Sequence, residues 1–466
     1  MENLETLFKD AEQLLEKNND QELALFLQEL NISEAKELID EFPDYGPRFI
    51  ELLPIGRAIH VFRILDFPVQ ERIIKKLPGY KISEIINELP PDDRTAFFSD
   101  LHADVVKKLI ILLPSEERKE ALGLLGYKED SVGRLMTPDY IAVKKDWDVA
   151  RVFNHIRKYG INSETIDVIY VIDDQGVLLD DLRIRKVLLS DPETTVAELT
   201  DDRLISLKAD DPQEEAIEVF RMNNRVALPV TDDNNILLGI VTIDDILWVA
   251  KEEYTEDMQK MGGMDALDEP YLDTPFFNLI KKRAPWLIIL FLSEMLTTTA
   301  MTYFQVELEK ATVLALFIPL VMSSGGNSGS QASTLIIQAM AVGEVTIKDW
   351  WRVMRREILS GLALGILLGV IGFCRVSLWE FLHYIGIMDF SYGMHWLLIG
   401  STIGVALVGI ILWGSLAGSM LPIILKKIGA DPAASSAPFV ATLVDVTGII
   451  IYFSVAFMFL HGTLLK

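Results

Sequence analysis

The chain has 466 residues with 68 acidic and 43 basic side chains, which give it a formal charge of −25. Residues 284–466 contain 10 acidic and 9 basic residues, so nearly all of the surplus acid lies in residues 1–283. This acidic surface disfavours nucleic-acid binding, because phosphate recognition needs basic side chains. The single Cys374 excludes a disulfide-stapled protein. Length and the charge split together predict several domains, one of them in a membrane.

Residues 1–130 are expected to form an α-helical, superhelical domain. Their first segment is acidic and has no apolar core, so no signal peptide is expected. A short motif then recurs at spacings of 22 and 24 residues, with a proline four residues before an arginine: Pro68 and Arg72, Pro90 and Arg94, Pro114 and Arg118. Proline suits the first turn of a helix, so this repeat predicts stacked helical hairpins.

From residue 131 short β-type runs alternate with helical segments, as an α/β fold requires. Two similar units follow one another, and they resemble a tandem pair of CBS domains, over 131–195 and 196–253. In the second unit Thr242 and Asp245 fit the ribose-binding pattern of that family, whereas the first unit lacks it. An adenine nucleotide such as ATP could bind there, but a purely structural pair fits the sequence equally well.

Residues 254–283 are expected to connect the acidic part to the membrane. The helix that begins in the second CBS unit should continue with its acids exposed until Gly262 and Gly263 break it. This segment is either a plain linker or a connecting helix that transmits the arrangement of the preceding domains to the membrane domain.

Residues 284–466 are predicted to form a five-helix transmembrane domain. A bilayer crossing takes about 20 apolar residues, and five stretches are long enough: 284–304, 311–340, 357–379, 395–425 and 436–460. Because the second and fourth are longer than a crossing needs, we expect tilt or breaks in them. Lysine and arginine cluster before the first span and after the second and fourth, which places the N-terminus in the cytoplasm and the C-terminus outside a cell membrane.

Asp445 is a candidate cation-binding carboxylate within the membrane. It lies nine residues after Ser436 in an apolar span, or about 14 Å along a helix, close to the middle of the bilayer. A carboxylate at that depth is costly and calls for a function. It could instead be neutral and hydrogen-bonded, but no Lys or Arg shares its span to form a salt bridge.

The second span is rich in glycine and polar side chains, which are poor partners for lipid. Backbone broken at membrane depth is tolerated where it faces protein or a water-filled path, so Asn327, Gln331 and Thr334 are candidate pore-lining residues. Close packing of helices through small residues is the alternative, and both explanations can hold together.

Oxygen ligands without a His or Cys cluster favour a hard cation such as Mg²⁺, which sheds its water reluctantly. One aspartate per chain supplies few ligands for such an ion. Two-fold symmetry would place two copies of Asp445 around one path, which argues for a homodimer in the lipid bilayer.

The domain order and two motifs resemble the MgtE family of magnesium transporters over essentially the whole chain. The motifs are Pro319 followed by GGNSGSQ at 325–331, and Asp431-Pro432 followed by the segment 438–448 that contains Asp445. The resemblance implies a homodimeric, Mg²⁺-selective, channel-like pore for magnesium uptake, lined by the second and fifth spans. It also implies a gate that is held closed when cytosolic Mg²⁺ bridges acidic residues of the cytosolic domains.

The acids that match the regulatory positions implied by the resemblance are Asp245, Glu253, Glu256, Asp257 and Asp431, together with either Asp92 or Asp93. Trp248 and Asn224 stand where the family can carry an acid, so one regulatory ion site is expected to be weak or missing. Repulsion within the acidic part gives such a gate a physical basis, since bound divalent cations would favour the compact state.

The main alternative is a less selective transporter of Co²⁺, Mn²⁺ or Ni²⁺, because Asp445 offers oxygen to any of these ions. A membrane metalloprotease would need a zinc motif such as HExxH, and no histidines in the spans are so arranged, so we expect no enzyme. A chloride channel with CBS domains would need more spans and a cationic path.

Overall fold

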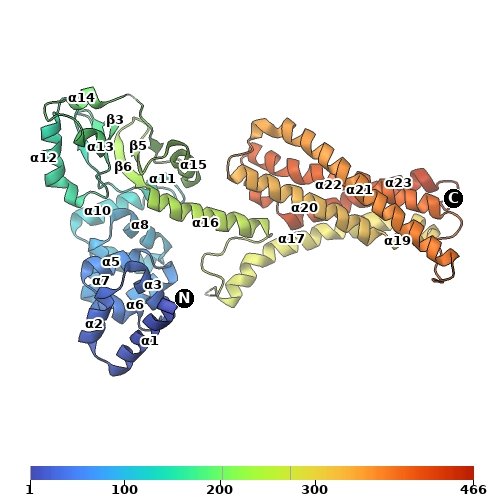
Figure 1. Cartoon of the computed structure of the whole chain (residues 1–466), viewed down its shortest axis with the longest axis horizontal. Helices are drawn as coiled ribbons and strands as arrows, with labels where there is room; N and C mark the ends of the chain where they lie inside the picture. Colours follow the sequence, from blue (N-terminus) through green and yellow to red (C-terminus); the bar gives the residue numbers. More distant parts are fainter. Residues whose placement is uncertain (1, 202, 273, 466) are drawn as a thin grey trace. The chain divides into compact units, whose positions relative to one another are not determined.

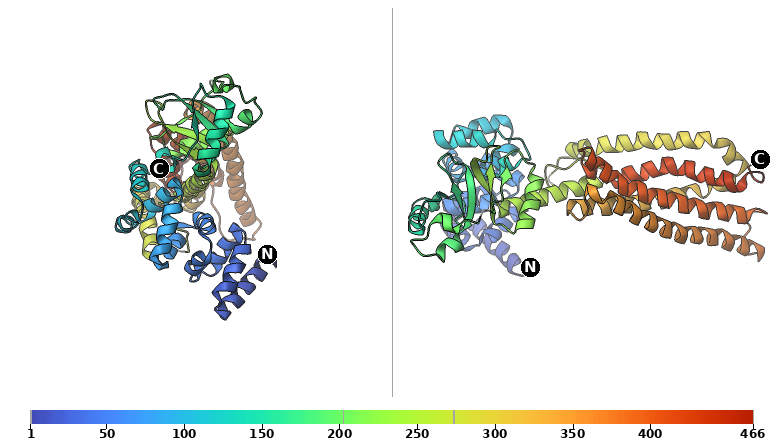
Figure 2. Two further views of the ribbon diagram at one scale, coloured as in Figure 1. Left: turned by 90° about the vertical axis from the view of Figure 1, so that its left-hand side faces the viewer. Right: turned by 90° about the horizontal axis from the view of Figure 1, so that it is seen from above.

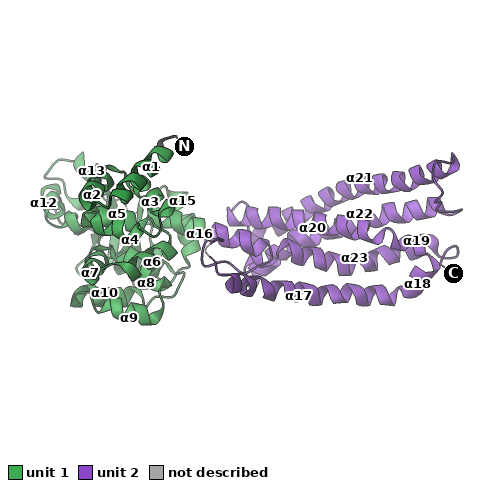
Figure 3. Cartoon of the chain, turned by 90° about the horizontal axis from the view of Figure 1, so that it is seen from below, with its two compact units in different colours: residues 1–252 green, residues 253–466 purple. Residues whose placement is uncertain are grey.

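The structure is a computed structural model that describes residues 2–201, 203–272 and 274–465. The chain divides into two compact units, residues 1–252 and 253–466 (Figure 3). One helix, α16 (Ile243–Met261), contains the boundary, and each unit is described separately below.

The first unit begins with short helices that share one apolar core (Figure 1). Helices two apart along the chain pack together, for example α4 on α6 and α5 on α7, so the predicted stacked hairpins are confirmed. The helices are α1 (Glu2–Lys17), α2 (Asp20–Glu29), α3 (Ile32–Glu41), α4 (Gly46–Leu52), α5 (Ile55–Arg63), α6 (Phe67–Lys76), α7 (Gly79–Glu88), α8 (Pro91–Asp100), α9 (Ala103–Ile110) and α10 (Ser115–Leu124).

Two of the three arginines of the proline–arginine repeat, Arg94 and Arg118, donate hydrogen bonds to carbonyl groups near the end of the preceding helix. The last carbonyl groups of a helix have no partner within it. Arg118 Nε donates to the carbonyl oxygen of Ile110 at 3.1 Å, and Arg94, which is buried, donates to that of Ile86 at 3.5 Å. The repeat therefore encodes a helix start and a cap for the helix before it.

Two three-stranded sheets follow, with orders β1-β2-β3 and β4-β5-β6, each with a parallel and an antiparallel pair. The matching topologies confirm two repeated α/β units. Their elements are α11 (Val132–Leu135), β1 (Ala142–Val143), α12 (Val149–Tyr159), η1 (Gly160–Asn162), β2 (Val168–Ile172), β3 (Leu178–Arg183), α13 (Ile184–Leu188), α14 (Val196–Leu199), β4 (Leu207–Lys208), α15 (Gln213–Asn223), β5 (Ala227–Thr231), β6 (Leu237–Thr242) and α16.

The second unit is built from long apolar helices that run side by side (Figure 2). Among the described residues four helices are long and apolar enough to cross a membrane: α17, η2 with α21, α22 and α23. Its elements are α17 (Phe276–Tyr303), α18 (Gln305–Lys310), α19 (Thr312–Ala315), α20 (Ile318–Ala341), η2 (Ile347–Asp349), α21 (Trp350–Tyr384), α22 (Trp396–Lys427), η3 (Pro432–Ala434) and α23 (Ala437–Leu460).

Helix α20 corresponds to the second predicted span but is not among those four, because its glycines and polar side chains lower its hydropathy. It packs against α22 and α23. The count of five spans therefore stays a prediction.

A break is found in one of the two spans for which we expected tilt or breaks. The second span is interrupted at Leu316 and Phe317, ahead of the glycine motif, and α20 is continuous through it; α22 is also continuous. The glycines serve close packing instead: a Cβ on Gly414 would lie 2.5 Å from the carbonyl oxygen of Gly325, and one on Gly329 would lie 2.9 Å from Val440. Small residues thus bring α20 against α22 and α23.

Candidate functional site

Asp445 lies in the first half of α23, and its side chain is half-buried. The Ser436 side chain caps the helix by accepting a hydrogen bond from the Phe439 amide at 3.4 Å. Within the described parts of the chain the Asp445 carboxylate forms no hydrogen bond and no ion pair. The alternative in which a neighbouring group of the same chain satisfies this carboxylate is thus not what the structure shows.

The predicted pore-lining residues share one face of α20. Asn327 and Gln331 are exposed and Thr334 is half-buried, and spacings of four and three residues place them on one side of a helix. The opposite side carries the buried glycines that pack on α22 and α23. The glycine motif therefore has two roles, in packing and in presenting a polar stripe.

Hydrogen bonds and close contacts fix the register of α20 against α23. Ser330 Oγ donates to the carbonyl oxygen of Ala437 at 2.9 Å, and a Cβ on Gly326 would meet Ala441 at 3.4 Å. The helices are antiparallel, so Asp445, one turn beyond Ala441, is level with the turn before Gly326. Asp445 is therefore level with the turn of α20 that precedes Asn327, where the polar stripe begins.

Glu294 is a second acid that the sequence analysis did not include in the site. It lies on α17, which packs against α23, and its charge is close enough to act on Asp445. Glu294 and Thr442 line an open groove of about 660 Å³ whose other walls are apolar. The sequence signal was available, since Glu294 is an acid inside an apolar span.

In the first unit Asp245 lies near enough to the adjacent Asp92 and Asp93 for their charges to interact, although it is about 150 residues away in the sequence. Arg63 forms an ion pair with Asp93 and lies 3.6 Å from Glu164. Both Asp92 oxygens are buried without a hydrogen-bond partner. We call Asp92, Asp93, Glu164 and Asp245 the buried acid cluster; sequence reasoning missed Glu164 and Arg63, which only the fold brings there.

Burial is the main reason why the pKa values of Asp92, Asp93 and Asp245 are raised. It raises the pKa of Asp93 to about 7, against the attraction of Arg63, and the pKa of Asp245 to about 6. It raises the pKa of Asp92 well above the usual range, and the charges of Asp245 and Asp93 add to the effect. The carboxylates of the cluster outnumber the arginines beside them, so the cluster has a deficit of positive charge that a cation or protons would relieve.

As they stand, the side chains do not form a finished metal site. No group of three or more His, Cys, Asp or Glu side chains in the described ranges is arranged to hold an ion. The unsatisfied oxygens of Asp92 fit a hard cation chemically, but the carboxylates would have to converge further.

Thr242 and Asp245, the predicted nucleotide residues, are adjacent where β6 meets α16. The Thr242 hydroxyl donates to Asp245 Oδ2 at 2.7 Å. Asp245 therefore belongs both to the predicted ribose pattern and to the buried acid cluster.

In the second unit Lys260 joins two of the predicted regulatory acids. Its ammonium group lies 2.7 Å from Asp431 Oδ2 and also forms an ion pair with Glu256. These hydrogen bonds and charges outweigh burial and raise the pKa of Lys260. Glu253 and Asp257 are half-buried on the same helix. Sequence reasoning missed Lys260, although its position four residues after Glu256 on a helix was a signal.

The two departures from the family pattern have local explanations. Asn224 ends α15 in a left-handed conformation with φ of 48°, which asparagine adopts more readily than most residues. Trp248 is 49% exposed, and the Lys251 ammonium lies 5.0 Å from its ring centre. Neither residue supplies a carboxylate.

Comparison with known protein families agrees with this arrangement. The family model described as a divalent cation transporter, MgtE, matches residues 318–455. The MgtE intracellular N domain matches residues 45–130, and the CBS domain matches residues 132–188 and 196–252.

Individual relatives cover most of the chain. The magnesium transporter MgtE of Thermus thermophilus is 35% identical over 418 residues, which are 84% of this chain and 89% of the relative. MgtE of Bacillus subtilis is 27% identical and covers 94% of this chain and 97% of itself. A crystal structure of the cytosolic domain of the Mg²⁺ channel MgtE in complex with ATP is similar, with a TM-score of 0.50, 31% identity, and coverage of 52% of this chain and 99% of that one. The chain belongs to the MgtE family of magnesium transporters.

Proposed function

We propose that this protein is a Mg²⁺-selective, channel-like transporter for magnesium uptake in which Asp445 binds the passing ion. The observation that carries the proposal is a half-buried carboxylate in an apolar helix with no partner in its own chain, within the described residues. A carboxylate with nearby amide and hydroxyl side chains can hold Mg²⁺ that keeps most of its water. Asn327, Gln331 and Thr334 would line the path beside it.

A homodimer is the assembly that this site favours. The polar stripe of α20 and the groove beside Glu294 are open in the single chain, and polar side chains at membrane depth call for protein or water against them. Two-fold symmetry would bring two Asp445 carboxylates to one ion and double its attraction. Transport is then a property of the dimer.

The cytosolic part is proposed to sense Mg²⁺. Ions bound by the buried acid cluster, and by acids at the end of α16, would relieve repulsion and favour a compact, closed state. The proposed regulatory residues are Asp92, Asp93, Asp245, Glu253, Glu256, Asp257 and Asp431. With domains at 1–130, 131–195, 196–253, 254–283 and 284–466, the N-terminus would be cytoplasmic and the C-terminus outside.

A nucleotide site is proposed at the second CBS domain. The crystal structure of the similar cytosolic domain contains ATP, and Thr242 and Asp245 of this chain keep the ribose pattern side by side. Because Asp245 also belongs to the buried acid cluster, nucleotide and Mg²⁺ binding would be coupled there.

Ion flux into liposomes containing the purified full chain tests the proposed selectivity. We expect Mg²⁺ flux, and we expect Co²⁺, Mn²⁺, Ni²⁺ and Ca²⁺ each to move more slowly than Mg²⁺ by about tenfold or more. The reason is that the proposed site would hold a hydrated ion, and these ions differ from Mg²⁺ in how readily they lose water. Equal rates for Co²⁺ or Ni²⁺ would favour the alternative of a less selective divalent-cation transporter. Empty liposomes are the control.

Lys260 is expected to compete with Mg²⁺ for Asp431 and Glu256. Replacing it with glutamine leaves these carboxylates without their cation, so the concentration of cytosolic Mg²⁺ that halves the flux should fall by about threefold, the size of a partly exposed ion pair. Lys251→Gln, on the same helix, is the matched control. An unchanged or higher half-inhibiting concentration in Lys260→Gln would contradict the competition.

A further inference from the structure

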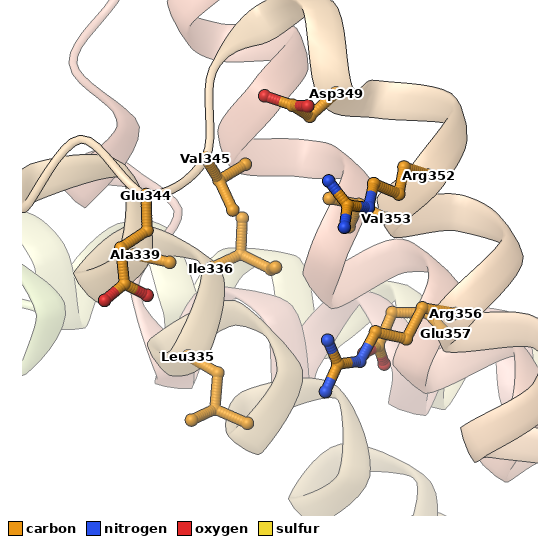
Figure 4. A pocket seen from close by; sticks show the side chains of 10 residues that line it. All are labelled: Leu335, Ile336, Ala339, Glu344, Val345, Asp349, Arg352, Val353, Arg356 and Glu357. Atoms are coloured by element: carbon orange, nitrogen blue, oxygen red, sulfur yellow. The ribbon is translucent and has the colours of Figure 1, made fainter.

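A pocket of about 390 Å³ lies where α20, the following loop and the start of α21 meet (Figure 4). Its apolar wall comes from Leu335, Ile336, Val345 and Val353. Val353 and Ile336 also belong to a small buried core with Met340 and Ile423, so this wall is fixed by packing.

Two guanidinium groups enter this pocket from one helix. Arg352 and Arg356 are one turn apart on α21 and point toward the α20 side (Figure 4). In the part of the chain that the structure describes, neither forms a hydrogen bond or an ion pair. Two arginines four residues apart present a fork of donors that suits a phosphate group.

Three carboxylates, those of Glu344, Asp349 and Glu357, line the same pocket and outnumber its two arginines, so it does not suit a purely anionic ligand. Asp349 is already engaged, because its carboxylate accepts hydrogen bonds from the Thr346 amide at 3.0 Å and hydroxyl at 2.7 Å. The Glu344 carboxylate has no such partner among the described residues. A ligand with a phosphate for the arginines and an amine for Glu344 would match both charges.

The surroundings indicate that this ligand is a lipid. The pocket lies at the end of an apolar helix, and Trp350 and Trp351 beside it are 49% and 59% exposed, as tryptophans at a membrane interface are. Arginines in pockets between membrane helices hold the phosphate of lipid head groups. We propose that the pocket binds the head group of an aminophospholipid, with the phosphate on Arg352 and Arg356 and the ammonium beside Glu344.

The test is lipid retention by the full chain, purified in detergent and measured by native mass spectrometry. Phosphatidylethanolamine should be retained about tenfold better than phosphatidylcholine or phosphatidylglycerol with the same acyl chains. The double variant Arg352→Gln/Arg356→Gln should retain all three lipids less well, because each of them carries the phosphate that the arginines bind. Arg355→Gln is the matched control, because Arg355 is on the same helix but does not line the pocket.

Glu344→Gln tests the binding of the ammonium group separately from the binding of the phosphate. It also tests the proposal if the double variant does not fold. It should remove the preference for phosphatidylethanolamine over phosphatidylcholine and leave phosphatidylcholine retention unchanged. Equal retention of all three lipids by the unchanged protein, or an unaltered preference in Glu344→Gln, would overturn the proposal. So would displacement of the lipid by millimolar inorganic phosphate, which would indicate a site for the free ion.

Discussion

Replacing Asp445 with asparagine is expected to reduce Mg²⁺ flux into liposomes by at least about a hundredfold while the protein still folds. Asparagine keeps the shape of the side chain and removes only its charge. The attraction between a divalent ion and a carboxylate in a partly buried site is on the order of several kcal/mol, and a dimer would lose two of them. Because Asp445 has no hydrogen bond in the described chain, folding should not depend on its charge.

Glu294→Gln is the matched control, because it neutralises the other acid near Asp445 from a different helix. We expect its flux to fall by less than about threefold, since a single charge at the groove is partly screened by solvent. Size-exclusion chromatography and thermal unfolding should give the same profile for both variants. If Asp445→Asn keeps a third or more of the flux, Asp445 is not the ion-binding residue of the pore.

An element of the fold could be predicted from the sequence when the residues that determine it lie close together in the sequence. The proline–arginine repeat and the alternation of short β-type runs with helical segments are local, and both correctly predicted their elements. The glycine motif was ambiguous, because small residues suit both a broken span and tight packing. Only the contact between Gly325 and Gly414 decides for a continuous, closely packed α20.

The candidate sites show the same limit. Asp445 could be found from one chain segment, since an acid in an apolar run is conspicuous. Glu164 could not, because nothing in its neighbourhood in the sequence indicates that the fold places it beside Arg63 and the acids of α8. Lys260 lies between these cases: its pairing with Glu256 is local, but its contact with Asp431 spans 171 residues.

Neutralising the buried acid cluster is expected to change how stability depends on pH. In the folded protein the pKa values of Asp93 and Asp245 are about 7 and about 6, above their usual 3.8. The folded state therefore binds more protons than the unfolded state between pH 4 and 7. The cluster destabilises the first unit above pH 7, and this penalty is relieved as the pH falls through 7 and 6 toward the usual value.

Asp92→Asn tests this expectation, because both Asp92 oxygens are buried without a partner. At pH 8 the variant should be more stable by on the order of 2 kcal/mol, because it removes a buried negative charge and its repulsion from Asp93 and Asp245, and the gain should shrink by pH 5. Hydrogen exchange of α8 and the first turn of α16 in the full chain, corrected for intrinsic rates, measures it. Glu88→Gln, an exposed acid on α7, is the control.

Mg²⁺ and protons should compete for the same carboxylates if the cluster is a sensor. Millimolar Mg²⁺ should then slow exchange in α8 of the unchanged protein by about tenfold at pH 8 and by much less at pH 5.5, where protons already neutralise the acids. In Asp92→Asn the effect at pH 8 should be clearly smaller, because one ligand is gone. Equal protection by Mg²⁺ at both pH values would mean that the ion binds elsewhere. The buried acid cluster would then affect only how the stability of the first unit depends on pH.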